Sequence, residues 1–306
     1  MTFSPRFVLT KLLTPCIVGL CVWYVLQDVD LPLLLATFGE HPPALYAVAC
    51  ILFPITLLPM CMRLHVLMNG RCSLNVASKA VFFGSGANCI LPARLGDVAK
   101  AAYLTRTSGI PTATTLCAVF WERLADMCVV LLLALLLGLR FEARFLYLPL
   151  MLAVGGVFVG LVLVNRFPHW FRRMATLFPA RRIRDLFNDM IDLVSDRSQW
   201  PSWPRLFALS VLVWGSFSVF NTLFLHFFFD MPIDIWTGIL VGVAGAIGMM
   251  VPAMPANIGT YEASVVAALI LSGQDKSLAL AAALLLHAVS VLPTATFAAV
   301  TMIRGK

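Results

Sequence analysis

Uninterrupted apolar runs of about twenty residues recur along this chain, and that length lets an α-helix cross the hydrocarbon core of a bilayer. No other feature constrains the fold as strongly. Of the 306 residues, 60% are hydrophobic and 12% are charged, whereas a typical soluble domain is about 25% charged. A water-soluble monomer could not cover so much apolar surface. The sequence predicts an all-α, polytopic membrane protein, a single integral membrane domain over residues 1–306 with about seven to nine membrane segments.

The apolar runs define the expected membrane segments. The run at residues 7–26 has no small-residue cleavage site after it, so we expect a retained first span and not a signal peptide. Two regions, at residues 81–103 and 252–272, are shorter and are interrupted by proline and glycine. The remaining runs lie at residues 44–62, 112–139, 145–164, 206–229, 235–251 and 276–303.

Basic residues set the expected orientation. The net charge of +7 follows from the positive-inside rule, under which lysine and arginine collect in cytoplasmic loops, and we infer no nucleic-acid partner. We place both termini, the loop holding Arg63, Arg71 and Lys79, and residues 165–205 in the cytoplasm. Residues 165–205 hold eight arginines. Apolar side chains recur at helical spacing over residues 183–194, which predicts an amphipathic helix on the membrane surface.

The sequence carries no signature of cofactor chemistry. None of the eight cysteines forms a C-x-x-C pair, and most lie inside apolar runs, where a free cysteine behaves as a small buried hydrophobe. No P-loop, zinc signature, dinucleotide fingerprint or nucleophile elbow occurs. We therefore expect no metal, no cofactor and no disulfide framework.

The two interrupted regions resemble each other. The first reads Leu91-Pro-Ala-Arg-Leu-Gly-Asp97, and the second reads Met254-Pro-Ala-Asn-Ile-Gly-Thr260. A non-helical backbone at membrane depth is tolerated only against protein or a water-filled cavity, so we expect both regions to line a cavity. The positions expected to act as hinges are Pro92, Gly96, Pro255 and Gly259.

Each interrupted region belongs to a longer unit, one at residues 80–139 and one at residues 235–303. The charge-derived topology makes the first unit enter from the cytoplasm and the second from outside. The sequence thus predicts two inverted repeats, each with a broken or re-entrant helix pair, as in many transporters. The alternative is that such short matches arise by chance in a chain rich in alanine and glycine.

Three charged residues fall close together inside the helix expected at residues 112–139. Glu122 lies roughly 15 Å along that helix, near the bilayer centre, where each charge costs about 2.5–3.5 kcal/mol. Glu122 and Asp126 share a helix face, and Arg123 can pair with Asp126. One interpretation is an ion-pair cluster that locks helices together. The other is a polar cavity that holds a headgroup or moves a proton.

Further ionisable residues flank the two interruptions. Arg94, Asp97 and Lys100 surround the first, where the basic pair either extends to the cytoplasmic surface or Arg94 coordinates a phosphate in the cavity. Glu262 follows the second, either as a carboxylate stabilised by a helix N-terminus or as a cavity group. His287 in the last helix is either a hydrogen-bonded core histidine or a further cavity group.

These motifs in combination resemble the lysylphosphatidylglycerol synthase transmembrane-region family, also called the flippase-like domain family. The resemblance covers nearly the whole chain. The family includes the membrane half of the bacterial multiple peptide resistance factor and stand-alone members. The residues that carry the resemblance are residues 91–97 with Lys100, then Glu122, Arg123 and Asp126, then residues 255–259 with Glu262.

The resemblance implies a multi-pass protein of the bacterial inner membrane that moves a lipid between leaflets. The implied cargoes are aminoacyl-phosphatidylglycerol, a hopanoid or a polyprenyl-linked sugar. The chain departs from the family at Asp97 and Lys100, where Gly-Glu and a following arginine are common, and near His287, where an arginine is common. By the resemblance, the residues that line a central cavity are Arg94, Asp97, Glu122, Arg123 and Glu262.

The leading hypothesis is therefore a lipid flippase or transporter whose partners are membrane lipids. No ATP-binding motif is present, so a gradient, another protein or equilibration would drive it. One alternative is a membrane-embedded transferase acting on a lipid-linked sugar, with Glu122 or Asp97 as base. Another is a non-transporting partner of a lipid biosynthetic enzyme. The residues expected to bind substrate are Arg94, Asp97, Lys100, Glu122, Arg123, Asp126, Glu262 and His287.

Overall fold

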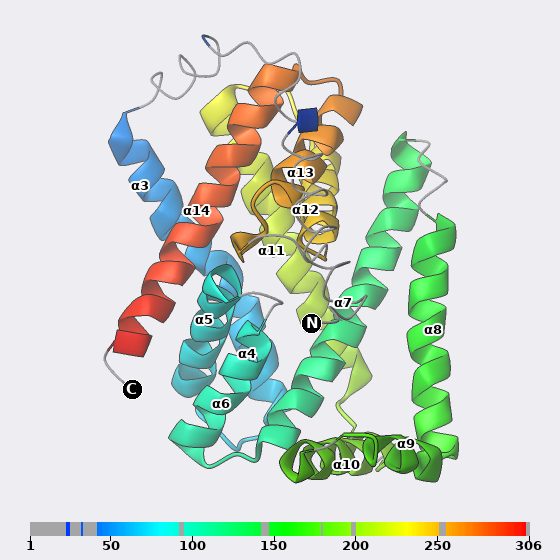
Figure 1. Cartoon of the computed structure of the whole chain (residues 1–306). Helices are drawn as coiled ribbons and strands as arrows, with labels where there is room; N and C mark the ends of the chain where they lie inside the picture. The colour runs from blue at the N-terminus through cyan, green and yellow to red at the C-terminus, as the bar shows by residue number, and fades with distance from the viewer. Residues whose placement is uncertain are drawn as a thin grey trace, which may run out of the picture. The chain divides into compact units, whose positions relative to one another are not determined.

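Every regular element in the described part of the chain is a helix, and no strand occurs there (Figure 1). The all-α prediction is confirmed for these residues. The span expected at residues 7–26 lies outside them, apart from Trp23 and Tyr24. The computed structural model describes residues 23–24, 32, 42–91, 95–141, 147–178, 180–196, 200–250 and 255–303.

The chain forms two compact units, which are described separately. Helices α5 (Leu74–Ile90) and α11 (Trp203–Phe229) pass from one unit to the other, and the unit boundary also falls after the first residue of α6 (Gly96–Ser108). Unit 1 comprises Met1–Leu57, Ser85–Gly96 and Trp214–Lys306, and unit 2 comprises Leu58–Gly84 and Asp97–Val213.

Unit 1 is built around α12 (Ile235–Met250), α13 (Thr260–Leu271) and α14 (Lys276–Ile303). Glycine allows α12 to approach α13 closely, because a Cβ at Gly248 would lie 2.5 Å from the carbonyl oxygen of Thr260. This packing places the first turn of α13 in the interior of the unit.

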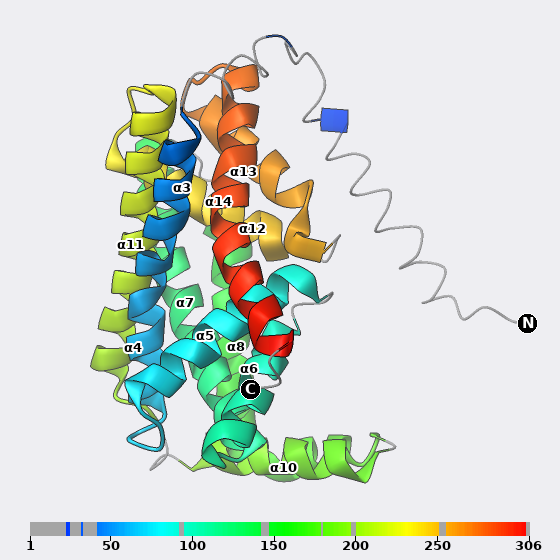
Figure 2. The same ribbon diagram turned by 90° about the vertical axis from the view of Figure 1, so that its left-hand side faces the viewer.

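The first described helix of unit 1, α3 (Pro43–Leu52), lies between α11 and α14 (Figure 2). It continues into a short 3₁₀ helix, η1 (Phe53–Leu57). Helices α3 and η1 pack against α11 through aromatic rings. Phe53 contacts Phe220 edge to face, with ring centroids 5.4 Å apart.

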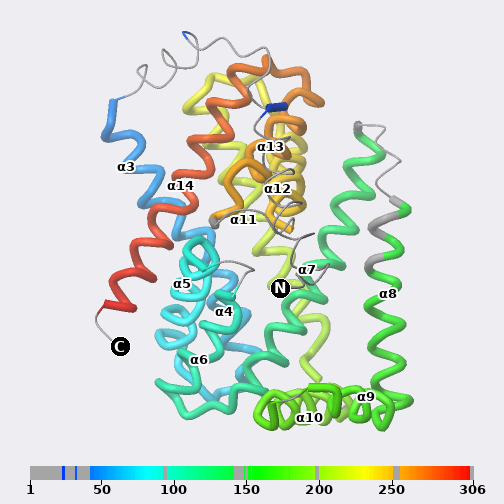
Figure 3. Tube along the Cα trace, in the orientation of Figure 1, coloured from blue at the N-terminus to red at the C-terminus, as the bar shows by residue number. Residues whose placement is uncertain are grey.

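Unit 2 contains α4 (Leu58–Leu67), α6 (Gly96–Ser108), α7 (Thr112–Phe141) and α8 (Tyr147–Arg166). Helices α7 and α8 lie side by side (Figures 1 and 3). One apolar core joins α4, α5 and α6, and a second joins α7 and α8 to the start of α11. The long helix α7 takes part in both cores.

After α8 the chain turns sharply within unit 2. The axis bends by 95° between residues 154–166 of α8 and the short helix α9 (Pro168–Ala175). Helix α10 (Arg181–Ser195) follows and lies across the direction of α7 and α8 (Figure 1). The helix predicted over residues 183–194 is therefore present, and it buries Ile191 and Val194.

Three helices in the described residues are long and apolar enough to cross a membrane, and the bent pair at α8 and α9 could supply a fourth. They are residues 43–67, α11 and α14. Helices α12 and α13 are apolar but shorter. These helices support a multi-pass membrane protein, whereas the seven to nine segments stay a prediction.

Two expected boundaries were wrong. The helix expected over residues 44–62 continues to Leu67, so Arg63 lies inside a helix and not in a cytoplasmic loop. Helix α5 begins at Leu74, so Lys79 is also helical. In both cases the predicted boundary was set at a charged residue because the apolar run stops there. A helix can continue through a charged residue whose side chain has a partner or reaches water.

The order of elements around the two interruptions is the same. At the first interruption, the 17-residue helix α5 ends and the 13-residue helix α6 follows. At the second, the 16-residue helix α12 ends and the 12-residue helix α13 follows. Each second helix ends near a glycine with positive φ, Gly109 at 67° and Gly273 at 89°. Glycine suits this left-handed position because it has no Cβ. Helices of 30 and 28 residues follow.

Candidate functional site

Arg63 lies inside α4 with only 1% of its surface exposed. Its Nη1 and Nη2 atoms donate to Oδ1 and Oδ2 of Asp126 in α7 at 2.5 and 3.2 Å. Nη1 also donates to Oγ of Ser210 in α11 at 2.8 Å. A planar guanidinium facing both oxygens of a carboxylate makes a strong and directional contact. Three helices of unit 2 thus meet at one side chain.

Glu122 of α7 lies between two cations. Nζ of Lys100 in α6 donates to its Oε2 at 2.8 Å, and Nε of Arg63 lies 3.8 Å from its Oε1. Glu122 is 1% exposed and Lys100 is 4% exposed. Arg63 Nε and Glu122 Oε1 make no hydrogen bond within the described residues, so they interact as charges. Glu122 therefore links α4 to α6 through α7.

Asp97 and Arg123 form the more accessible part of this site. Nη2 of Arg123 donates to Oδ1 and Oδ2 of Asp97 at 3.1 and 3.0 Å, and the Arg123 side chain is 44% exposed. Nη1 of Arg123 lies 3.7 Å from Oδ2 of Asp126. Oδ1 of Asp97 lies 3.8 Å from Nζ of Lys100.

These contacts close into a ring in which positive and negative side chains alternate. Each member lies within 4 Å of two members of opposite sign, so the ring is neutral as a whole. Burying a charge is costly, and removing one member of a buried pair typically costs about 3–5 kcal/mol. In order, this charge ring runs Asp97, Arg123, Asp126, Arg63, Glu122, Lys100 and back to Asp97.

Local sequence explains how α6 and α7 present these groups. The backbone N–H of Gly96 donates to Oδ1 of Asn88 at 2.8 Å at the start of α6. Asp97 then occupies the first turn, where a helix favours a carboxylate, and Lys100 lies one turn later on the same face. On α7 the neighbouring Trp121 packs into the apolar core against Trp203, with ring centroids 5.6 Å apart. This packing fixes the rotation of α7.

A second buried ionisable pair lies in unit 1. Nδ1 of His287 in α14 donates to Oε1 of Glu262 at 2.6 Å, and the N–H of Gly259 donates to Oε2 at 2.6 Å. Tyr261 covers the imidazole, with ring centroids 4.3 Å apart. Both Glu262 and His287 are buried. The carboxylate therefore caps α13 and ties it to α14.

The predicted site residues fall into two groups. Asp97, Lys100, Glu122, Arg123 and Asp126 come together in the charge ring of unit 2. Glu262 and His287 pair with each other in unit 1. Among the positions expected as hinges, Gly259 has a φ of 91° and Pro255 begins the 3₁₀ turn η5 (Pro255–Asn257). Arg94 and Pro92 lie outside the described residues.

Sequence reasoning missed Arg63 and its partner Ser210. The sequence predicts a cytoplasmic loop at Arg63, because Arg63 is the first charge after an apolar run. Leu64, Val66 and Leu67 continue the apolar pattern beyond it, and this was the available signal that the helix goes on. No signal in the sequence marks Ser210.

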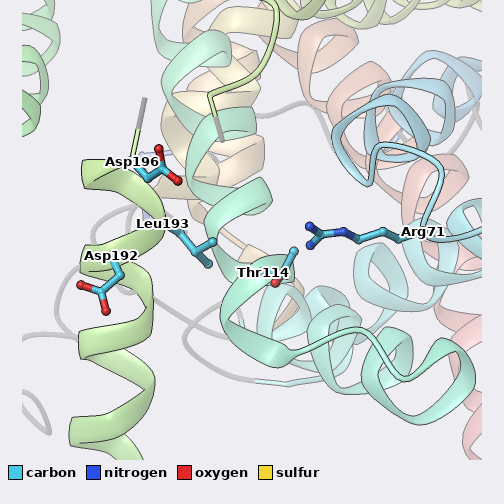
Figure 4. A pocket seen from close by; sticks show the side chains of 5 residues that line it. All are labelled: Arg71, Thr114, Asp192, Leu193 and Asp196. Carbon is cyan, nitrogen blue, oxygen red and sulfur yellow. The ribbon is translucent and has the colours of Figure 1, made fainter. Parts of the chain in front are cut away.

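A separate hollow of about 380 Å³ lies in unit 2 (Figure 4). Arg71 reaches toward Thr114 on one side, and Asp192 and Leu193 of α10, with Asp196 just after its end, form the other side. The hollow contains none of the predicted site residues. No group of three or more potential metal ligands occurs in the described part of the chain. The residues that line the hollow are Arg71, Thr114, Asp192, Leu193 and Asp196.

Comparison with known families decides the identity of this membrane domain. Residues 11–298 match the lysylphosphatidylglycerol synthase TM region family. The chain belongs to this family. No curated protein and no solved structure matches the chain. The match confirms the resemblance that the motifs around the two interruptions indicated.

As a lysylphosphatidylglycerol synthase TM region protein, the chain is a multi-pass membrane protein of a lipid-related family. Contact with lipid is therefore part of its normal environment. Within this domain, the charge ring contains three buried charged side chains, Arg63, Lys100 and Glu122.

Proposed function

We propose that the protein moves a lipid with a polar headgroup between membrane leaflets and that the charge ring binds this headgroup. The observation that carries the proposal is the closed ring of alternating charges in an otherwise apolar domain. Ionisable residues inside membrane segments are expensive, and they commonly mark substrate or ion pathways. Membership of a lipid-related family supports a lipid as the cargo.

Binding would begin at the Asp97–Arg123 edge of the ring. Arg123 is the most exposed member, so its guanidinium can donate to a phosphate without the loss of buried packing. The phosphate would then take the place of Asp97 beside Arg123. A headgroup that supplies its own partner for the released carboxylate keeps every charge paired, which avoids the cost of an isolated buried ion. Of the cargoes that the resemblance implies, an aminoacyl-phospholipid fits this exchange best, because it carries both a phosphate for Arg123 and an ammonium group for Asp97. A polyprenyl-linked sugar supplies the phosphate alone, and a hopanoid skeleton supplies neither charge.

Movement between leaflets would use the repeated order of elements. In this proposal α5–α6–α7 and α12–α13–α14 are inverted repeats, and the charge distribution of the loops supplies the inversion. The hinges would be Gly96 and Gly259 with Pro92 and Pro255. The same charge distribution supports cytoplasmic termini, and the family resemblance supports the bacterial inner membrane as the location.

Transport can be measured with purified protein in vesicles that carry a trace of NBD-labelled phosphatidylglycerol or phosphatidylethanolamine. Dithionite bleaches the label only in the outer leaflet, so transport exposes the inner pool. We expect wild type to accelerate bleaching and Arg123→Ala to lose at least about ten-fold of that rate, since removing a charged partner costs more than 1.4 kcal/mol. Arg106→Ala is the matched control, because Arg106 is an exposed arginine of α6 outside the ring.

Each outcome separates the hypotheses. Folded Arg123→Ala protein with wild-type transport would overturn the assignment of the ring. Mass spectrometry of the vesicle lipids would reveal a covalent change, which favours the embedded transferase. The non-transporting partner is favoured if the purified protein gives no transport and no lipid product, and a lipid biosynthetic enzyme co-purifies with it from cells.

A further inference from the structure

Charge is divided sharply along the segment that follows the span at α8. Residues 166–184 contain six arginines and no acidic residue. The next residues, 185–196, contain four aspartates and no basic residue. The two parts therefore differ in the surfaces that they can contact, although both belong to one amphipathic stretch.

The arginine-rich part also exposes large apolar side chains. Trp170 is 64% exposed and Leu177 is 79% exposed. Phe167 stacks on Trp170, with ring centroids 5.5 Å apart. Together these side chains form the basic-apolar corner, whose exposed apolar members are Phe167, Trp170, Met174, Leu177, Phe178 and Ile183.

The aspartate-rich part is instead bound to the rest of unit 2. Ile191 and Val194 are buried, and α10 contacts α7 and α8. Nε1 of Trp200 donates to the carbonyl oxygen of Val194 at 2.9 Å. Asp192 pairs with Arg172. The C-terminal end of α10 is thus packed against the rest of unit 2, whereas the basic-apolar corner leaves its apolar side chains exposed.

Several arginines of the basic-apolar corner have no acidic partner among the described residues and can therefore bind an anionic ligand. Arg166, Arg173 and Arg182 are exposed and form no ion pair with the described residues. Arg172 pairs with Asp192 of α10. Nε of Arg181 lies 3.8 Å from Oδ2 of Asp185, also in α10. The corner therefore keeps an excess of positive charge beside its apolar side chains.

We propose that the basic-apolar corner docks on anionic phospholipid headgroups at the surface of the bilayer. Trp170 and Leu177 would insert at the headgroup boundary, and Arg166, Arg173 and Arg182 would pair with phosphate. The 95° bend after α8 supports a lipid surface over a soluble partner. If residues 154–166 cross the membrane, this bend directs the basic-apolar corner along the membrane surface. The proposal does not depend on lipid transport.

Quenching of Trp170 fluorescence tests the proposal with the full chain in nanodiscs. The difference between wild type and Trp170→Phe isolates the emission of Trp170. One set of discs contains phosphatidylcholine with a fixed fraction of dibrominated phosphatidylglycerol as the anionic lipid. The other contains the same fraction of dibrominated phosphatidylcholine. We expect bromine on phosphatidylglycerol to quench Trp170 more strongly, and high salt to remove the preference.

Charge variants identify the arginines responsible. Arg173→Gln/Arg182→Gln should weaken the preference for phosphatidylglycerol by about five-fold for each arginine. Lys79→Gln/Arg106→Gln removes two exposed charges of unit 2 elsewhere and should leave it unchanged. Equal quenching by both brominated lipids in wild type would overturn the anionic assignment. Absence of quenching by either would overturn docking on the bilayer and leave the corner to a soluble partner.

Discussion

The guanidinium of Arg63 donates to both carboxylate oxygens of Asp126, at 2.5 and 3.2 Å, across 63 positions of sequence. This contact closes the charge ring, because the other members lie on α6 and α7 alone. It makes α4 part of the site and not only part of the scaffold. Stability and headgroup binding are therefore expected to depend on the same side chain.

Arg63→Ala should destabilise the protein strongly. The substitution leaves Asp126 and Glu122 with one cation fewer in a buried place, which typically costs about 3–5 kcal/mol of unfolding free energy. Thermal unfolding in detergent, followed by tryptophan fluorescence, measures the change. Arg106→Ala removes an exposed arginine of the same unit and should alter stability by less than about 0.5 kcal/mol. If both variants unfold at the same temperature, the buried pairing of Arg63 is wrong.

A paired substitution should separate stability from transport. Lys100→Met alone leaves Glu122 short of a partner and should cost about 3 kcal/mol, whereas Lys100→Met/Glu122→Leu keeps the ring neutral and should recover most of that loss. The double variant should nevertheless fail in the vesicle transport assay. Additive losses of stability would mean that the two side chains do not interact, and full transport by the double variant would make the ring purely structural.

Glu262→Ala should cost about 2–4 kcal/mol of unfolding free energy, because the carboxylate both caps α13 and accepts from buried His287. Glu262→Gln should lose less, since its amide oxygen still accepts one hydrogen bond. Asp275→Ala is the control, because Asp275 caps α14 with hydrogen bonds to Ser277 and Leu278 and has no histidine partner in the described structure. A control loss equal to that of Glu262→Ala would show that His287 adds nothing.

Gly86→Ala should disturb unit 1 by overpacking. A Cβ at Gly86 would lie 1.9 Å from the carbonyl oxygen of Thr294 in α14, and backbone cannot move aside cheaply. The expected loss is about 1–3 kcal/mol. Gly156→Ala on α8 meets no atom within 4 Å, so better helix propensity should make it neutral or slightly stabilising. Equal melting temperatures for the two variants would contradict the close approach of α5 and α14.

The sequence by itself determined the features that neighbouring residues encode. Apolar periodicity predicted the helices at residues 112–139, 235–251 and 276–303, and the structure places α7, α12 and α14 there with ends shifted by at most two residues. The charges of the ring on α6 and α7 were also visible, because an ion inside an apolar run stands out and one helix turn sets which of them share a face.

The tertiary structure alone decided which charges meet. The sequence offered Arg123 and Asp126 as a local pair, but it could not show that Arg63 would take the main contact with Asp126 or that Lys100 would bind Glu122. Nor could it show that His287 would pair with Glu262 rather than join the other ionisable residues. Such partners lie on separate helices, and their distances depend on how those helices pack and rotate. That depends on contacts such as Trp121 with Trp203 and Gly86 with Thr294, which local periodicity does not encode.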